Sequence, residues 1–471
     1  MAVDHFVGRQ DAVSHLADVL NGRIRAGGQL TVQSVEGPGG IGKTCLFNHV
    51  LETNNLGNRN YLTLKIDGNV DGNDPSAQSL VRSVSRLVDS AEADAIRGKP
   101  AGYYFQSVGR VTKAIETIRS EAVVEFQKKH PNSEDGRAAL LRFLDLAFEA
   151  GKRVNDAIPI TKKHVNIREL EKAKRLLEEI IPTLVSLQEE GANFWEHFGM
   201  FSSSRALRNS IKENACKALA DALVSDLSAI LKHYRPVDKG TAAHRKVSGI
   251  DRLLLILDDY EKLQEFLNEF LVGHLLPALR SANFESTVIL LVRDQLEVTH
   301  PAWDQHLKPN LLKRMALDHL QRAEMNELVE AFGIRSAVEK DRAWRDTQGY
   351  PFYVQLWIEE VESGGRSAVM LKRFYDRTTR WMNERERRWL EHTLFLDAVN
   401  IRSLRGMLGS DSEAHEAFRW FERNGSVRDT VGTSFRVREY LRSRLVDYLR
   451  ASDPDRCDEL ESLSQPFSPV S

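Results

Sequence analysis

Short apolar runs bounded by turn residues recur along this chain and predict the strands of a buried sheet. Their length is typical of strands rather than helices, and their mostly apolar composition indicates that both faces of the sheet are covered. The runs lie at residues 29–35, 61–66, 253–257 and 287–292, with a further short one at 316–320. Because helical segments separate them, we expect an α/β fold with a parallel sheet flanked by helices.

Apolar residues at three- and four-residue steps predict helices over most of the remaining chain. The clearest example is residues 167–187, a helix that Pro182 should kink or divide. Residues 371–450 are mostly helical by the same criterion, with a hairpin-like stretch at 426–437. Further helices are expected at 43–52, from Asp74 or Ser76 to 88, at 204–233, up to 332, and at 337–347 and 352–363.

Composition and charge limit the classes of protein to consider. The 471 residues suggest about three domains, and 42% hydrophobic with 28% charged residues is the balance of a soluble globular protein. A formal net charge of −2 gives no chain-wide basic field for nucleic acid or for a membrane surface. No apolar run approaches the roughly 20 residues that span a bilayer, and residues 1–6 lack the character of a signal peptide.

The cysteines point to a reducing compartment. Cys45, Cys216 and Cys457 are far apart and show no metal-ligand spacing, which favours a cytoplasmic location. Cys45 directly follows the segment described next, and we interpret it as a buried, inert thiol rather than a site of oxidation.

One segment carries a full signature for phosphate binding. Residues 37–44 read Gly-Pro-Gly-Gly-Ile-Gly-Lys-Thr, the Walker A pattern, between an expected strand and an expected helix. Glycines allow successive backbone N–H groups to turn towards an anion, and the positive end of the helix adds to the attraction. Lys43 is expected to reach the β- and γ-phosphates, and the Thr44 hydroxyl to bind Mg²⁺. The sequence therefore predicts a P-loop that binds ATP or ADP with Mg²⁺.

Two aspartates at the end of a later apolar run predict the rest of the metal site. Asp258 and Asp259 directly follow Leu257. Asp258 is expected to hold Mg²⁺, directly or through water, and Asp259 to orient or deprotonate the attacking water. Acidic residues also end many strands for no chemical reason, but the full Walker A pattern favours the metal site.

Two further residues have both a functional and a structural interpretation. Arg293 ends the next strand, where its cation can reach the γ-phosphate; the alternative is a solvated arginine at a strand end. Pro351 follows Gly349 and Tyr350, and it either stacks on the adenine or starts a helix. Taken alone, the helix start is the better interpretation of Pro351.

Five features in one order resemble the STAND class of P-loop ATPases, the NACHT and NB-ARC relatives that are close to AAA+ proteins. They are residues 6–9 (Phe-Val-Gly-Arg) before a helix, the P-loop, the aspartate pair, Arg293 and the Gly-Tyr-Pro element. A region of winged-helix size follows, and the resemblance covers about residues 4–67 and 249–450. The aspartate pair, the glycine-x-proline element and the lack of an evident arginine finger favour STAND over typical AAA+ proteins.

The resemblance implies roles for individual residues. Val7, Gly8 and Arg9 would line the adenine pocket, Arg293 would be the first sensor, and Pro351 would contact the base from a helical lid. Such proteins act as switches, in which ADP holds a closed form and exchange for ATP opens it for assembly. The nucleotide site would contain Val7, Gly8, Arg9, Gly37, Gly39, Gly40, Ile41, Gly42, Lys43, Thr44, Cys45 and Pro351, with Thr44 and Asp258 on the metal and Lys43, Asp259 and Arg293 in hydrolysis.

This chain departs from the family pattern in its spacing. Far more residues separate Lys43 from Asp258 than the roughly 60–90 that two or three βα units take, so an insertion is expected. The pair Arg438-Glu439 stands where many NB-ARC winged helices carry histidine and aspartate. The expected divisions are a P-loop core at 1–90 and 250–300, a helical insertion at 91–249, a helical lid at 301–368, a winged helix at 369–450 and a flexible tail at 451–471.

The expected function is a slow ATPase whose nucleotide state controls assembly, either with a separate protein partner or effector or with further copies of the chain. Arg436, Arg438 and Arg442 favour an alternative, a DNA-binding ATPase of the initiator or transposition-helper kind. Interleaved acidic residues favour instead a regulatory domain whose arginines pair with the ATPase core. A third interpretation is a nucleotide-binding scaffold without turnover, and no membrane partner is expected.

Overall fold

The computed structural model describes twelve parts of the chain. These are residues 6–53, 61–68, 80–91, 105–129, 214–233, 252–293, 296, 298, 300–365, 368–379, 382–431 and 434–467. The helix expected at 167–187, the start of the one expected at 204–233 and the loop expected at 235–249 lie outside these ranges.

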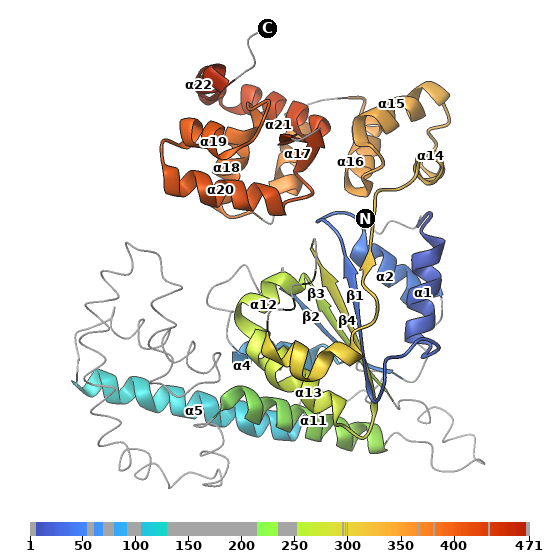
Figure 1. Ribbon diagram of the computed structural model, residues 1–471, viewed down its shortest axis with the longest axis vertical. Helices are drawn as coiled ribbons and strands as arrows, with labels where there is room; N and C mark the ends of the chain where they lie inside the picture. The colour runs from blue at the N-terminus through green and yellow to red at the C-terminus, as the bar shows by residue number, and fades with distance from the viewer. Residues whose placement is uncertain are drawn as a thin grey trace.

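Five parallel strands form one sheet in the order β2-β3-β4-β1-β5 (Figure 1). The α/β fold predicted from the sequence is confirmed. The four longer strands agree with the predicted runs to within two residues, whereas β5 is only two residues long because it pairs only with the end of β1. This pairing extends the sheet to Ala316, past residue 300, where we expected the core to end. The strands are β1 (Leu30–Glu36), β2 (Tyr61–Asp67), β3 (Arg252–Asp258), β4 (Glu285–Val292) and β5 (Met315–Ala316).

Side chains alternate between the two faces of the sheet and build two hydrophobic cores. Leu253, Leu255 and Leu257 enter one core, and Leu254 and Ile256 enter the other. The first face is covered by α4 (Leu80–Asp89), α5 (Gln106–Lys129), α11 (Ala215–His233), α12 (Tyr260–Asn268), η3 (Glu269–Leu275), α13 (Leu276–Arg280) and η4 (Trp303–Leu307), which leads into η5 (Lys308–Asn310). The second face is covered by α1 (Gln10–Leu20) and α2 (Lys43–Thr53), and its core continues into the helices that follow β5, which lie beyond one end of the sheet (Figure 1).

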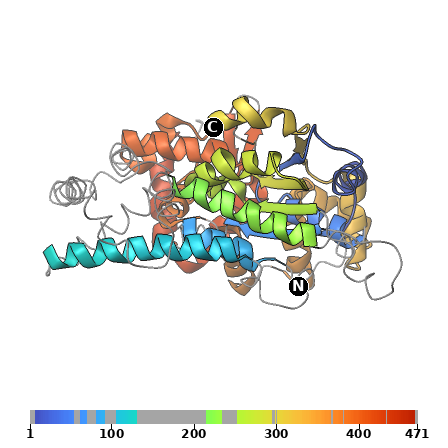
Figure 2. The same ribbon diagram turned by 90° about the horizontal axis from the view of Figure 1, so that it is seen from below.

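Helices α5 and α11, which belong to the segment that we expected to be an insertion, lie side by side against the first face (Figure 2). A buried carboxylate fastens them together: Asp226 of α11 accepts hydrogen bonds from the backbone N–H groups of Ser107 (2.8 Å) and Val108 (2.9 Å). The N–H groups in the first turn of a helix have no carbonyl acceptor within that helix, so the Asp226 carboxylate supplies one for α5. Its negative charge also interacts favourably with the positive N-terminal end of the helix dipole. Neither α5 nor any other described helix is both long enough and apolar enough to cross a bilayer.

The C-terminal half continues with helices and one hairpin. A group of three helices comes first: α14 (Arg322–Ala331), α15 (Ala337–Thr347) and α16 (Pro351–Glu362). We call these three helices the lid. The remaining elements are α17 (Ala368–Thr379), α18 (Glu384–Leu394), α19 (Ile401–Leu408), α20 (Asp411–Arg423), β6 (Arg428–Val431), β7 (Ser434–Val437) and α21 (Glu439–Ser452). Strands β6 and β7 pair antiparallel, which confirms the predicted hairpin, and Val399 adds an isolated bridge to Phe435.

The flexible tail expected at 451–471 is wrong over most of its length. The chain forms α22 (Pro454–Ser464) and the short helix η6 (Gln465–Phe467). Asp453 caps α22 by accepting from the backbone N–H of Arg456 at 3.1 Å, and Pro454 occupies the first turn. Cys457 and Leu460 are fully buried in the second core, so packing holds this helix in place despite its polar composition.

Candidate functional site

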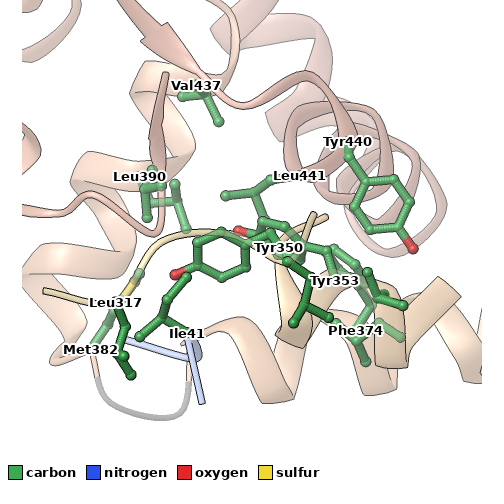
Figure 3. Close-up of a cluster of buried hydrophobic side chains, with 14 of the residues drawn as sticks. Ile41, Leu317, Tyr350, Tyr353, Phe374, Met382, Leu390, Val437, Tyr440 and Leu441 are labelled. Atoms are coloured by element: carbon green, nitrogen blue, oxygen red, sulfur yellow. The ribbon is translucent and has the colours of Figure 1, made fainter. Parts of the chain in front are cut away.

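The loop between β1 and α2 turns at three glycines. Gly37, Gly40 and Gly42 have φ values of 147°, 82° and 94°, where an L-amino acid side chain would be strained. Ile41, the one bulky residue among them, is fully buried and lies beside Leu317 (Figure 3). The glycines therefore permit the turns of the loop, and the isoleucine anchors it to the second core.

Lys43 folds back over this loop from the first turn of α2. Its Nζ donates to the carbonyl oxygens of Gly37 at 2.6 Å and of Pro38 at 3.2 Å, and the residue is only 7% exposed. Burial lowers the pKa of Lys43, and the carboxylates of Glu261 and Asp259 act in the opposite direction. A phosphate group at this loop would supply a further counter-charge for the buried ammonium.

Thr44 and Asp258 meet although 214 positions separate them in the sequence. The Thr44 hydroxyl lies 3.1 Å from Oδ2 and 3.3 Å from Oδ1 of Asp258, and the backbone N–H of Asp259 donates to Oδ1 at 3.1 Å. Burial raises the pKa of Asp258, the neighbouring Asp259 raises it further, and Lys65 opposes both. Two hard oxygen donors thus stand together where β3 ends and α2 begins, and their role as metal ligands stays a prediction.

Arg293 is held by two carboxylates at the end of β4. Its Nε lies 3.3 Å from Oδ1 of Asp259 and 3.1 Å from Oε1 of Glu261, and its backbone N–H donates to Oε2 of Glu261 at 3.0 Å. The side chain is mostly buried, so the solvated-arginine alternative is wrong. Because β4 lies between β1 and β3, Arg293 stands between the loop and the aspartate pair.

Sequence reasoning missed Glu261. Burial raises its pKa, and the positive charge of Arg293 opposes this. The signal was its spacing: Glu261 lies three residues after Asp258, in the first turn of α12, close enough to act on the same site. The site therefore holds a third carboxylate beside the predicted aspartate pair.

Gly8 and Arg9 contact the first helix of the lid and the segment before it. The backbone N–H of Arg9 donates to Oε1 of Glu324 at 2.8 Å, and Nη2 of Arg9 donates to the carbonyl of Asp318 at 2.9 Å. Gly8 has a φ of 70°, and a Cβ there would stand 2.2 Å from Oε1 of Glu324, so this contact requires glycine. The Arg9 guanidinium also reaches Gly42, where a Cβ would lie 3.1 Å from its Nη1. The sequence analysis did not predict a role for Glu324. Its position in the capping box of α14 does not indicate a contact with Arg9.

The Gly-Tyr-Pro element reaches the loop through its tyrosine rather than its proline. Pro351 occupies the first turn of α16, which confirms the structural interpretation; its contact with adenine stays a prediction. Tyr350 is fully buried, and its hydroxyl donates to the carbonyl oxygen of Gly39. The sequence analysis assigned no role to Tyr350, because no local pattern links it to a loop 311 positions away.

Cys45 is exposed, so our expectation of a buried thiol is wrong. The second core takes Leu46, Phe47 and Val50 from α2, and Cys45 lies outside that apolar stripe. Cys216 and Cys457 are buried, and none of the three cysteines forms a disulfide.

The residues at this edge fit a magnesium-bound nucleotide. Within the described ranges, no group of three His, Cys, Asp or Glu side chains is arranged to hold a metal ion alone. Mg²⁺ commonly takes one or two protein oxygens and completes its shell with phosphate oxygens and water. Thr44 and Asp258 supply such oxygens beside a glycine cradle and a buried lysine, so this donor set suits Mg²⁺ held jointly with a phosphate chain.

The structure brings most of the predicted site residues to one edge of the sheet. The loop at 37–44, Asp258, Asp259 and Arg293 lie at the carboxyl ends of the parallel strands, where ligands of such sheets bind. Arg9 and Tyr350 approach the loop from the lid side. No protein-family model matches the chain, and no curated protein matches it either.

Proposed function

We propose that this protein is a STAND-type ATPase, which binds ATP with Mg²⁺, hydrolyses it slowly and uses its nucleotide state to control assembly with a protein partner or with copies of itself. The contact between Thr44 and Asp258 carries this proposal. It joins the end of a Walker A loop to an acidic strand end in the arrangement that shared Mg²⁺ binding requires. The buried cation of Lys43 beside the same loop supports a phosphate ligand in particular.

The proposed hydrolysis distributes its tasks over five side chains. Lys43 neutralises the β- and γ-phosphates, while Thr44 and Asp258 hold the metal, which screens the phosphate charge when bound. Asp259 orients the attacking water and accepts its proton. The new bond forms between the water oxygen and the γ-phosphorus, the bond to the β–γ bridging oxygen breaks, and ADP and phosphate leave. Arg293, at the end of β4, stabilises the charge on the departing phosphate.

A chain of contacts from the loop to the C-terminal region supports the switch. Tyr350 donates to Gly39, and the Arg438 guanidinium lies 5.1 Å from the centre of the Tyr350 ring. Arg438 itself donates to the carbonyl of Gly425 at 2.9 Å, and the His319 ring packs edge-on against Tyr350. A nucleotide that moves the loop at Gly39 would therefore disturb Tyr350 and, through it, the cation–π contact with Arg438.

The lid and the C-terminal helices are joined firmly enough to move together. Arg444 of α21 is buried and lies 3.2 Å from Glu360 and 3.7 Å from Asp346 in the lid. The Tyr353 hydroxyl donates to the carbonyl of Ser426 at 2.8 Å. Apolar side chains, including Phe374, continue this contact towards α21 (Figure 3). Removing one member of a buried ion pair commonly costs about 3–5 kcal/mol, so this joint favours a rigid unit.

The contacts of the C-terminal arginines favour regulation over DNA binding. Arg436 lies 3.6 Å from Asp429 and Arg442 lies 3.3 Å from Asp397, while Arg438 packs on Tyr350. These arginines thus have partners within the chain and form no open basic stripe. The order α18, the Val399 bridge, α19, α20, β6 and β7 supports a winged helix, used here as a regulatory domain.

The loop contact of Tyr350 gives the switch a direct test. Tyr350→Phe keeps the ring but removes the hydrogen bond to Gly39, so we expect ADP to dissociate about two- to tenfold faster, the range of one such bond. Tyr375→Phe is the matched control, because it removes a hydroxyl that bonds Glu391 within the C-terminal region. Release of a fluorescent ADP analogue in stopped flow measures both. Wild-type release from Tyr350→Phe, with folding intact, would contradict the coupling.

A further inference from the structure

A cation other than Lys43 and Arg293 lies at the proposed metal site, on a strand that the nucleotide motifs do not include. Strands β2 and β3 pair in register, with Asp67 opposite Asp258. Lys65 lies two residues before Asp67 and therefore on the same face of the sheet, which is also the face that α2 covers. Its Nζ lies 3.6 Å from Oδ2 of Asp258.

The Asp258 carboxylate is thus shared among several donors. The Thr44 hydroxyl and the Asp259 N–H contact Oδ1, while the Thr44 hydroxyl and the Lys65 ammonium contact Oδ2. Asp258 is buried, whereas the Lys65 side chain is 40% exposed. Lys65 therefore reaches the carboxylate from the solvent side, and its charge is partly screened by water.

Lys65 contributes to the balance of charge around Asp258. Two carboxylates, Asp67 and Asp259, raise the pKa of Asp258, and Lys65 lowers it. The interacting groups comprise four cations, Lys43, Lys65, Lys262 and Arg293, and four carboxylates, Asp67, Asp258, Asp259 and Glu261. Removing Lys65 would change the formal sum of these eight charges from 0 to −1 beside the proposed ligand of a divalent cation. Such a cation interacts twice as strongly as a monovalent one with each unit of charge.

We propose that Lys65 competes with Mg²⁺ for Asp258 and so limits how tightly the protein holds magnesium-bound nucleotide. This inference rests on the proposed function, because it takes Asp258 as a metal ligand. Mg²⁺ must bind either against the repulsion of the lysine or after the lysine has swung away, and both cost affinity. Weaker metal binding shortens the lifetime of the bound nucleotide, which suits a protein that must exchange ADP for ATP.

The test compares Lys65→Met with wild type in the full chain. A fluorescent ADP analogue is bound first in EDTA and then titrated with Mg²⁺, so that nucleotide affinity and metal affinity are measured separately and no turnover is needed. Lys65→Met should bind Mg²⁺ about three- to tenfold more tightly, with the difference shrinking as salt is added. Lys65→Arg, which keeps the charge, and Lys308→Met, which removes an exposed lysine paired with Asp304, should match wild type.

Each other outcome has a separate meaning. Equal Mg²⁺ affinity in Lys65→Met and wild type, with nucleotide bound by both, overturns the competition and leaves the proposed function intact. If Lys65→Met binds nucleotide more weakly than wild type in EDTA, Lys65 contacts the phosphates directly. That result also overturns the proposed competition with Mg²⁺. Failure of the folded wild type to bind any nucleotide overturns the proposed function and this inference with it.

Discussion

Replacing Lys43 by alanine should abolish ATP binding, with an affinity loss of at least about a hundredfold in an equilibrium titration. The lysine ammonium is buried between the loop carbonyls of Gly37 and Pro38, so no water can take its place beside the phosphates without rearrangement. The phosphate chain would then enter a site lined by Asp258, Asp259 and Glu261 with its nearest cation missing. Charge repulsion and the loss of hydrogen bonds to the phosphates both lower the affinity for ATP.

A matched control separates this effect from a general change of charge. Lys308→Ala removes one positive charge from an exposed pair with Asp304 and should bind ATP as the wild type does. Denaturant unfolding of both variants establishes that the fold persists. Wild-type ATP affinity in a folded Lys43→Ala variant would refute the site.

Asp259→Asn should retain nucleotide binding and lower the hydrolysis rate by about a hundredfold or more, the usual size of a general-base contribution. Asparagine has nearly the same shape, and it tolerates the left-handed backbone that Asp259 adopts with φ 46° at the start of α12. It cannot accept a proton from water, so turnover alone should suffer. Phosphate release under single-turnover conditions measures this, with bound ATP quantified in parallel.

Glu261→Gln is the necessary companion to this variant. Glu261 and Asp259 both contact Arg293, so either carboxylate stands close enough to serve as the base. We expect Glu261→Gln to lower hydrolysis less than Asp259→Asn, because Glu261 holds both the side chain and the backbone of Arg293. An unchanged rate in Asp259→Asn together with loss of turnover in Glu261→Gln would transfer the role to Glu261.

The elements of the core were predictable because their signals are local. Strands β3 and β4 each contain five consecutive apolar residues, and the glycines before Lys43 form a pattern typical of a phosphate cradle. Helix α22 was missed although Asp453 and Pro454 form a helix start that can be seen in the sequence. The segment is mostly polar, so the sequence analysis overlooked Cys457 and Leu460, which pack into the second core. Tertiary packing, and not helix propensity, therefore determines the structure of this segment.

The partners of the site residues were not predictable for a different reason. Arg9 meets Glu324, Tyr350 meets Gly39 and Lys65 meets Asp258 only because of the order in which strands and helices are arranged. No periodicity encodes that β4 lies between β1 and β3, since the chain reaches β4 only after the insertion. Local patterns therefore indicated the side chains of the proposed site, while the contacts that join them to distant segments required the three-dimensional structure.

Hydrogen exchange of the full chain with and without nucleotide tests the central claim most directly, because it reports the loop and its coupled regions in one experiment. ATP with Mg²⁺ should protect backbone amides at residues 37–45, where the loop N–H groups would bind phosphate. Exchange at 349–354 and 434–442 should differ between the ATP-bound and ADP-bound protein, because Tyr350 and Arg438 connect these segments to Gly39. Unchanged exchange at 37–45 at saturating ATP would contradict nucleotide binding at this loop, and identical exchange with ATP and ADP at the other two segments would contradict the switch.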